Sequence, residues 1–465
     1  MTYAQERIVA ASSEPDHLAF PHDFVWGAAT AAYQVEGSVD ADGRKPSIWD
    51  AFAAQPGRVV NGDTGEYAAD HYRRWREDIG LMQQLGLGAY RFSLSWSRIL
   101  PDGTGRPNDA GLDFYDRLVD GLLAAGITPW ATLYHWDLPV GLESRGGWPV
   151  RDTAERFAEV AAASARRLGD RVKNWITLNE PWCSAFLGYS SGVHAPGRTD
   201  PAAAVAAAHH LLLGHGLATA VVREESPASR VGITLNLYPT LPANDSPAAA
   251  DAARRVDGLQ NRWFLDPVLR GRYPEDVRND LREITDFGHE RPGDLDVIAA
   301  PIDFLGVNYY SSHYVRPGAF PGSNPVEFVD RGRPRTALGW EIDHEGLTTI
   351  LRRIRADYGP IPLCVTENGA AFDDAVDVDG VVHDQDRVDY LASHVLACQQ
   401  AIDDGVPLTA YFVWSLLDNF EWAEGYGSRF GIVHVDFATQ QRTIKDSGWW
   451  YADFLARHRD GTLRP

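Results

Sequence analysis

The sequence predicts an α/β protein folded as a single (β/α)8 TIM barrel, with the active site at the carboxyl ends of the strands. Eight short apolar runs alternate with longer segments of helical spacing, which is the pattern of repeated βα units. Polar or aromatic residues stand at or near the carboxyl end of each run. A closed barrel brings these ends to one mouth, whereas an open doubly wound sheet would spread them along its edge.

The apolar runs are nearly continuous, as expected for strands that are covered on both faces. We expect strands at residues 24–34, 89–96, 129–136, 175–180, 231–238, 304–310, 363–367 and 408–414. The residues at their carboxyl ends are Gln34, Arg91, His135 with Trp136, Asn179 with Glu180, Asn236, Asn308 with Tyr310, Glu367 and Trp414.

Helix signals fall between these runs. Asp152 followed by Glu155 resembles an N-terminal cap, and Gly86 and Gly126 stand where helices could close. The alanine-rich stretch at 202–208 is expected to open another helix. Because the chain has no linker rich in Gly and Ser, we expect one barrel domain at residues 20–465 after an N-terminal extension at 1–19.

Composition narrows the functional classes. With 44% hydrophobic and 23% charged residues, the chain is expected to be globular and not disordered or fibrous. Its 43 basic and 64 acidic residues give a net charge of −21, which disfavours nucleic acid or an anionic membrane as a partner and favours a small or neutral one.

The three cysteines cannot form a full disulfide set, and none has a partner at metal-site spacing, so buried thiols in a reducing compartment are expected. The first twenty residues lack the basic start and the continuous apolar stretch of a signal peptide, and no later segment is expected to reach membrane-spanning length. A cytoplasmic location is the expectation that follows.

Two glutamates close apolar runs and are flanked by asparagine: Thr177-Leu178-Asn179-Glu180-Pro181 and Val365-Thr366-Glu367-Asn368-Gly369. Glycoside hydrolysis needs two carboxyl groups across a pocket, one protonated to assist the leaving oxygen and one to attack the anomeric carbon or activate water. A single strand-end glutamate is more often part of a salt bridge or helix cap, so neither would identify such a site alone.

The two pentapeptides resemble the acid/base and nucleophile motifs of glycoside hydrolase family 1, the β-glucosidase family. The resemblance runs from about residue 20 to residue 454. It also covers the stretch from Phe24 to Gly37, Tyr90-Arg91-Phe92-Ser93, Tyr134-His135-Trp136-Asp137, the stretch from Trp414 to Trp422, and Arg429-Phe430-Gly431.

This resemblance implies a retaining β-glycosidase, most simply a β-glucosidase acting on a small β-glucoside without a cofactor or metal. Glu180 would be the acid/base and Glu367 the nucleophile, with Arg91, Asn308 and Tyr310 holding Glu367. The implied substrate-binding residues are Gln34, His135, Trp136, Asn179, Asn308, Tyr310, Trp340, Trp414, Glu421, Trp422 and Phe430. Among them, Trp414 would lie under the sugar ring and Trp340 at the entrance.

The residue types suit a sugar, whose apolar faces stack on indole and whose hydroxyl edges bind amides and carboxylates. Glu421 would repel the phosphate of a phosphorylated sugar, and relatives that cleave thioglucosides lack the acid glutamate that Glu180 represents. An unphosphorylated O-glycoside is therefore expected, with a bell-shaped pH dependence of activity. The preference among glucose, galactose and fucose, and the natural leaving group, stay open.

Two other functions are compatible with parts of the sequence. Gly188-Tyr189-Ser190-Ser191-Gly192 fits the pattern of serine hydrolases, with Ser190 as nucleophile, but the residues that follow do not favour the prompt helix that the pattern requires. A catalytically inactive sugar-binding protein is the other alternative. His209, His210 and His215 lie in a helical stretch without metal-site spacing, so packing or solvation is their expected role.

Overall fold

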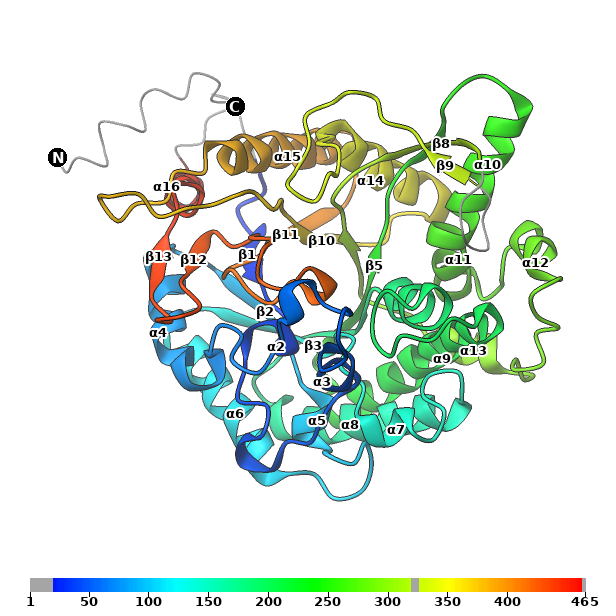
Figure 1. Cartoon of the computed structure of the whole chain (residues 1–465), viewed down its shortest axis with the longest axis horizontal. Coiled ribbons are helices and arrows are strands. Elements are labelled where there is room, and N and C mark those ends of the chain that lie inside the picture. The colour runs from blue at the N-terminus through cyan, green and yellow to red at the C-terminus, as the bar shows by residue number, and fades with distance from the viewer. Residues whose placement is uncertain (1–19, 319–325, 462–465) are drawn as a thin grey trace.

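In the computed structural model, which describes residues 20–318 and 326–461, the chain forms a closed barrel of eight parallel strands (Figure 1). The strands are β1 (Val25–Ala29), β2 (Ala89–Ser93), β3 (Thr128–Tyr134), β4 (Asn174–Asn179), β5 (Arg230–Asn236), β7 (Phe304–Asn308), β10 (Leu363–Asn368) and β11 (Leu408–Trp414). They follow chain order around the barrel, and β11 closes it by pairing with β1. The predicted fold class is confirmed.

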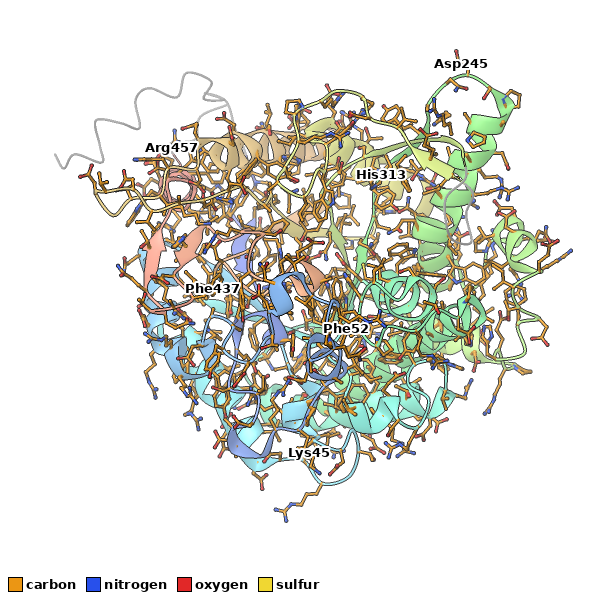
Figure 2. All side chains as sticks on the ribbon, in the orientation of Figure 1. Lys45, Phe52, Asp245, His313, Phe437 and Arg457 are labelled. Carbon is orange, nitrogen blue, oxygen red and sulfur yellow. The ribbon has the colours of Figure 1, made fainter. Side chains whose placement is uncertain are left out.

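Side chains fill the interior of the barrel and the space between the barrel and the outer helices (Figure 2). The ring of Trp130 packs edge-on against Phe304 and Phe412, at centroid distances of 5.2 and 5.1 Å. Gly27 leaves room for this aromatic cluster, since a Cβ atom there would lie 2.6 Å from the Phe412 ring. The barrel is thus a packed core that supports a site at one end.

Helices cover the outside of the barrel and connect consecutive strands (Figure 1). The α-helices are α2 (Ala32–Val35), α3 (Ile48–Ala53), α4 (His71–Gln84), α5 (Trp96–Ile99), α6 (Asp109–Ala124), α7 (Val140–Glu143), α8 (Arg151–Leu168), α9 (Pro201–Glu225), α10 (Pro247–Asp257), α11 (Trp263–Arg270), α12 (Glu275–Leu281), α13 (Asp294–Ile298), α14 (His344–Tyr358), α15 (Gln385–Asp403) and α16 (Asp446–Arg459). Short 3₁₀ or π-helical segments are η2 (Ala41–Gly43), η3 (Val60–Gly62), η4 (Cys183–Ser191), η5 (Gly258–Arg262) and η6 (Trp422–Glu424).

The glycine signals for helix ends are confirmed. Gly86 and Gly126 follow the last turns of α4 and α6 with φ of 68° and 76°, a left-handed conformation that favours glycine. The cap predicted at Asp152 is wrong, because α8 already begins at Arg151 and its N-cap residue is Val150. Asp152 instead lies in the first turn, where its carboxylate accepts a hydrogen bond from Arg156 and suits the positive end of the helix dipole.

The first predicted strand is also too long. β1 ends at Ala29, and the apolar residues that follow form the helical turn α2, which carries Gln34. The N–H of Ala32, at the start of this turn, donates to the Ser93 hydroxyl at 2.7 Å. A continuous apolar run cannot distinguish a strand from a short buried helix, which explains the error.

Helix α9 contradicts the expectation that no segment reaches membrane-spanning length. Its 25 residues are long and apolar enough to cross a membrane by length and composition, but 78% of its most apolar window is buried inside the protein. His215 of α9 pairs with Thr177 at 2.7 Å, and His209 pairs with Asp294 at 2.9 Å. Within the described residues, α9 is therefore a core helix of the barrel, and its start at Pro201 confirms the helix predicted from the alanine-rich stretch.

Two smaller sheets were not predicted. One contains β6 (Thr240–Pro242), β8 (His313–Pro317) and β9 (Val326–Phe328), and the other pairs β12 (Val433–Val435) with β13 (Arg442–Ile444). The predicted N-terminal extension, residues 1–19, lies outside the described residues. All three cysteines are free and buried, as predicted.

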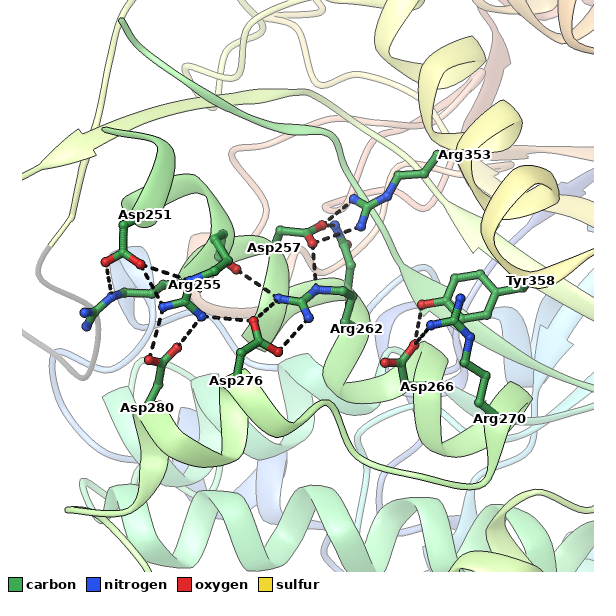
Figure 3. A network of polar contacts seen from close by, with 12 residues as sticks. Asp251, Arg255, Asp257, Arg262, Asp266, Arg270, Asp276, Asp280, Arg353 and Tyr358 are labelled. Carbon is green, nitrogen blue, oxygen red and sulfur yellow. Dashed lines mark hydrogen bonds and ion pairs between the residues drawn. The ribbon is translucent and has the colours of Figure 1, made fainter. Parts of the chain in front are cut away.

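Charged residues on the outer helices form a chain of ion pairs, here called the outer network (Figure 3). It consists of Arg254, Asp257, Arg262, Asp276, Asp280 and Arg353. Arg262 reaches Asp257 at 3.0 Å and Asp276 at 2.7 Å, and Arg254 lies 3.0 Å from Asp276. The outer network links α10, η5, α12 and α14.

Candidate active site

A cavity of about 430 Å³ lies at the carboxyl ends of the barrel strands, where the sequence places the site. Its volume is in the usual range for small-molecule sites. The lining contains polar groups and a wide aromatic and aliphatic wall. The lining residues are His135, Trp136, Glu180, Trp182, Cys183, Leu187, His194, Asn236, Leu237, Tyr238, Asn308, Tyr310, Ser311, His313, Leu338, Trp340, Glu367, Trp414, Glu421, Trp422, Ala423, Glu424 and Phe430.

Glu367 stands near the end of β10 and is held by two strong donors. Arg91 of β2 donates to Glu367 Oε1 at 2.6 Å, and the Tyr310 hydroxyl donates to Oε2 at 2.7 Å. Burial raises the pKa of Glu367, while the Arg91 charge and the Tyr310 hydrogen bond lower it. These contacts stabilise the ionised form, which a nucleophile requires.

Glu180 follows β4 with a left-handed backbone, at a φ of 47°. Asn308 donates to its Oε1 at 2.7 Å, and the Cys183 thiol contacts its Oε2 at 3.2 Å. Both donors are neutral, and no ion pair to Glu180 occurs in the described part of the chain. Burial, followed by the charge of Glu367, raises the pKa of Glu180 to about 8. Glu180 is therefore protonated at neutral pH and able to act as an acid.

Asn308 holds Glu180 and not Glu367. Its amide donates to Glu180 Oε1 at 2.7 Å and to Asn179 Oδ1 at 3.0 Å, which uses both of its hydrogens. The family resemblance implies that Asn308 holds Glu367, whereas the structure places its hydrogen bonds on the other glutamate. β7 and β10 are neighbours that pair Asn308 with Glu367, so Asn308 still lies close to the nucleophile candidate. Both glutamates line the same cavity.

Asn179 connects three other predicted site residues by hydrogen bonds. Its Oδ1 accepts from Arg91 at 2.6 Å and from Asn308 at 3.0 Å, and its Nδ2 donates to His135 Nε2 at 3.0 Å. Because Nε2 accepts, the neutral His135 ring carries its proton on Nδ1. Burial lowers the pKa of His135 well below its usual value, so the ring stays neutral.

Two predicted site residues each have a buried polar atom without a protein partner. His135 Nδ1 and Gln34 Oε1 find no partner among the described residues. The Gln34 amide group donates to Asn419 Oδ1 at 2.9 Å and to Glu421 Oε2 at 3.2 Å, which orients Gln34 Oε1 and Glu421. Since buried polar groups are normally hydrogen-bonded, a donor at Nδ1 and an acceptor at Oε1 suit the hydroxyl groups of a bound sugar.

Aromatic rings frame the cavity on two sides. Trp136 packs against Trp422 at a centroid distance of 4.5 Å, and the His135 ring stacks between Trp414 and Trp422 at 5.8 and 5.9 Å. On the other side, the Trp340 ring lies 5.3 Å from Tyr310 and 6.0 Å from Phe430. These surfaces can stack on the apolar faces of a sugar and of its leaving group.

The structure brings together most of the predicted site residues. Both glutamates and nine of the other predicted residues line the cavity: His135, Trp136, Asn308, Tyr310, Trp340, Trp414, Glu421, Trp422 and Phe430. Gln34, Arg91 and Asn179 are not lining residues, but each forms a hydrogen bond to one, namely Glu421, Glu367 and His135 respectively. Sequence reasoning missed Cys183, whose position three residues after Glu180 is the signal that one helical turn would bring them together.

The serine hydrolase motif does not have the required context. Residues 188–192 lie in and just after η4, whereas β4 ended at Asn179, so Ser190 does not stand between a strand and a helix. The histidines of α9 contact protein groups, such as the Trp148 carbonyl, which His210 reaches at 3.1 Å. No cluster of residues able to hold a metal is present among the described residues.

Fold and site together define a barrel enzyme with two facing carboxyl groups, the arrangement used for glycoside hydrolysis. The chain belongs to glycosyl hydrolase family 1, whose model matches residues 16–460. The family predicted from the motifs is therefore confirmed.

Individual relatives cover nearly the whole chain. Beta-glucosidase A of Thermotoga maritima is 52% identical over 439 residues, which are 94% of this chain and 97% of the relative. The crystal structure of a psychrophilic beta-glucosidase from Micrococcus antarcticus is similar with a TM-score of 0.93 and 51% identity, over 95% of this chain and 98% of that one. The Thermotoga maritima beta-glucosidase in complex with glucoimidazole gives a TM-score of 0.91 and 51% identity, over 94% and 99%.

Proposed function

We propose that this protein is a retaining β-glucosidase, which hydrolyses terminal non-reducing β-D-glucosyl residues of oligosaccharides or of aryl and alkyl β-glucosides. The observation that carries the proposal is the asymmetry of the two buried glutamates. Glu367 contacts a guanidinium, whereas Glu180 contacts neutral donors and has a pKa raised to about 8. Similarity to beta-glucosidases at about half identity supports the same assignment.

The first step forms a covalent intermediate. The Glu367 carboxylate attacks the anomeric carbon, and the bond between this carbon and the leaving oxygen breaks while Glu180 transfers its proton to that oxygen. Arg91 and Tyr310 keep Glu367 ionised and aligned before attack. As the ester forms, the negative charge of Glu367 disappears.

The second step releases the sugar. Loss of the Glu367 charge removes one of the causes that raise the pKa of Glu180, so Glu180 can now take a proton from water. The water oxygen attacks the anomeric carbon and Glu367 leaves as a carboxylate. Two displacements at the same carbon retain the β configuration.

Recognition of the sugar is assigned to the inner half of the cavity. Gln34 Oε1 and the Glu421 carboxyl group supply acceptors, His135 Nδ1 supplies a donor, and Trp414 supplies an apolar surface. Glu421 disfavours phosphorylated sugars, because its protonated carboxyl group brings no positive charge to pair with a phosphate and its ionised form repels one. Glucosidase inhibitors such as glucoimidazole bind a relative of this size and fold, which supports a small sugar substrate here.

A cytoplasmic location and a role in the breakdown of cellulose fragments belong to the same proposal. Cys183, Cys364 and Cys398 are free thiols, which suits a reducing compartment. Cellobiose is the disaccharide to test for the second part, beside aryl glucosides with galactose and fucose in place of glucose.

The decisive experiment determines which anomer of glucose is released first and which residue a mechanism-based reagent labels. Proton magnetic resonance of a fresh reaction with phenyl β-glucoside is expected to show β-glucose before its slow equilibration with the α form. A 2-deoxy-2-fluoro glucoside with a good leaving group is expected to label the peptide that contains Glu367, as read by mass spectrometry. Initial release of α-glucose would contradict the retaining mechanism.

The alternatives give different results in the same assays. Binding of glucose without release of phenol from phenyl β-glucoside would favour an inactive sugar-binding protein. Loss of activity in Ser190→Ala with activity kept in Glu367→Ala would favour a serine hydrolase. We expect the reverse, because Ser190 lies in a helical segment and Glu367 lies in the cavity.

A further inference from the structure

The Cys183 thiol lies directly beside the acid/base glutamate. Cys183 begins η4, and its backbone N–H donates to the Glu180 carbonyl at 3.0 Å, so one turn of chain folds the side chain back over Glu180. Its Sγ lies 3.2 Å from Glu180 Oε2. Asn236, at the end of β5, donates to the same sulfur at 3.6 Å. The thiol is therefore held between Glu180 and Asn236.

The contact with the Cys183 thiol gives the second oxygen of the Glu180 carboxyl group a hydrogen-bond partner. Asn308 of β7 occupies Oε1, and Cys183 of η4 occupies Oε2. Two donors on separate elements fix the plane of the carboxyl group, which one donor alone would leave free to rotate. A proton transfer requires the donor oxygen to point at the leaving oxygen, so this rotation matters for the first step.

A thiol is a suitable hydrogen-bond partner for Glu180, because the Glu180 carboxyl group changes its protonation state in each catalytic cycle. Sulfur is a weak donor and a weak acceptor, so Cys183 can donate to the Glu180 carboxylate and accept from the protonated acid. Burial and the charge of Glu180 raise the pKa of Cys183 well above its usual value, which keeps the thiol protonated. It therefore remains a neutral partner throughout the reaction.

We propose that Cys183 is a positioning residue for the acid/base step, whose thiol holds Glu180 Oε2 and fixes the direction in which the carboxyl group presents its proton. The inference rests on the proposed function, since it concerns the acid/base role of Glu180. It goes beyond that function because it assigns a role to a side chain that does not contact the reacting bond.

Several titratable groups face Glu180 from other elements and contribute to its protonation. They are Glu367 of β10, Arg91 of β2, Tyr310 after β7 and Glu421 after β11. Replacing any of these changes the charge of the site or its contacts with Glu367 or the sugar. Cys183 can instead be replaced by an uncharged residue, so its hydrogen bond can be tested by itself.

The test compares Cys183→Val, which lacks a donor, with Cys183→Ser, which keeps one. In Cys183→Val we expect kcat/KM for phenyl β-glucoside to fall about ten-fold, and the basic limb of its pH profile to move up by about 0.5 to 1 pH unit, because a donor to the ionised form is lost. For 2,4-dinitrophenyl β-glucoside, whose leaving group needs no proton, kcat/KM should fall less than about three-fold.

Cys183→Ser is expected to restore the wild-type basic limb. Cys398→Val, which changes another buried thiol in α15, is the matched control and should leave both substrates and the pH profile unchanged. Circular dichroism melting curves check the fold, and Cys183→Ala provides a smaller variant without a donor if valine overpacks the site.

Equal losses on both substrates with an unmoved basic limb in Cys183→Val and Cys183→Ala would overturn the inference, because a thiol that only fills space does not distinguish leaving groups. A wild-type protein that releases no phenol from phenyl β-glucoside would overturn the proposed function itself. The two failures are therefore separated by the wild-type measurement.

Discussion

The outer network and the catalytic cavity are both rich in charge, but their carboxyl groups behave in opposite ways. In the outer network, Asp276 lies between Arg254 and Arg262, and hydrogen bonds from Arg262 hold its pKa well below the usual range. In the cavity, burial raises the pKa of Glu180 and of Glu421 to about 8. The Arg91 guanidinium lowers the pKa of both Glu180 and Glu367 and forms an ion pair with Glu367, but burial outweighs it at both.

Exposure to water and the number of neighbouring arginines explain why the carboxyl pKa values differ between the two regions. The side chains of Arg254 and Asp276 are 33% and 37% exposed, so water and a paired charge both stabilise the ionised carboxylate. Glu180 and Glu367 are almost fully removed from water, and the nearby cation, Arg91, forms its ion pair with Glu367. The ion pairs of the outer network therefore contribute modestly to stability and have no proton to donate at neutral pH. In the cavity, Glu180 keeps a proton at neutral pH, and burying this carboxyl group costs stability.

The largest effect is expected from Glu367→Gln. The variant keeps the shape of the side chain and removes the nucleophile, so kcat for phenyl β-glucoside should fall by at least about 10⁴-fold. Release of phenol measured with a high enzyme concentration provides the number. Asp276→Asn, the same change of charge in the outer network, is the matched control, and a loss below ten-fold in Glu367→Gln would remove Glu367 as the nucleophile.

The pH profile of the wild-type protein should show the raised pKa of Glu180. Activity requires Glu180 protonated, so kcat/KM for phenyl β-glucoside should fall about ten-fold per pH unit above a basic limb near the Glu180 pKa of about 8. Protonation of Glu367, whose pKa burial raises above its usual value, should produce the acidic limb. Profiles recorded in a constant-ionic-strength buffer provide the test, and a flat profile from about pH 4 to 9 would contradict both assignments.

Much of the barrel and of the site could be predicted because the information is local. Continuous apolar runs marked all eight barrel strands, and residues such as Glu180 and Glu367 followed from the motifs at strand ends. The family prediction is confirmed by the match over residues 16–460. The roles of individual site residues remain predictions that the kinetics above can test.

The remaining features depend on tertiary contacts that local patterns do not record. The short helix that carries Gln34 is buried throughout and apolar except for Gln34, so its sequence resembles an extension of β1. Asn308 pairs with Glu367 in strand register but donates its amide to Glu180, and a local pattern does not record that long-range contact. Helix α9 resembles a membrane span in composition because its surroundings are protein core on nearly all sides.

The stability cost in the cavity should be visible at Glu421. The folded protein holds this proton up to about pH 8, while the unfolded chain releases it near 4.5, the usual pKa of a glutamate, so the folded state binds more protons between these values. Its stability contribution is thus fully present below pH 4.5 and is lost as pH rises through the folded pKa.

Glu421→Gln should remove this dependence. Between pH 5 and pH 8 the variant should lose less unfolding free energy than the wild type, by on the order of 3 kcal/mol, as measured by urea unfolding at both values. Glu424→Gln, at an exposed glutamate three residues along the chain, is the control and should behave like the wild type. Identical pH dependence in Glu421→Gln and the wild type would show that burial does not control this carboxyl group.

The smallest effect is expected in the outer network itself. Asp276→Asn weakens the contacts with Arg254 and Arg262, but both arginines keep other carboxylates, Asp280 and Asp257 respectively. Because the site is partly exposed, the loss in unfolding free energy should be about 0.5–1 kcal/mol at low salt and smaller at about 1 M salt, where charges are screened. Urea unfolding at the two salt concentrations measures it.

The kcat/KM of Asp276→Asn for phenyl β-glucoside should stay within about two-fold of the wild type, since exposed pairs of this kind stabilise the helices without reaching the cavity. A ten-fold loss of activity would instead show that the outer network positions the catalytic residues.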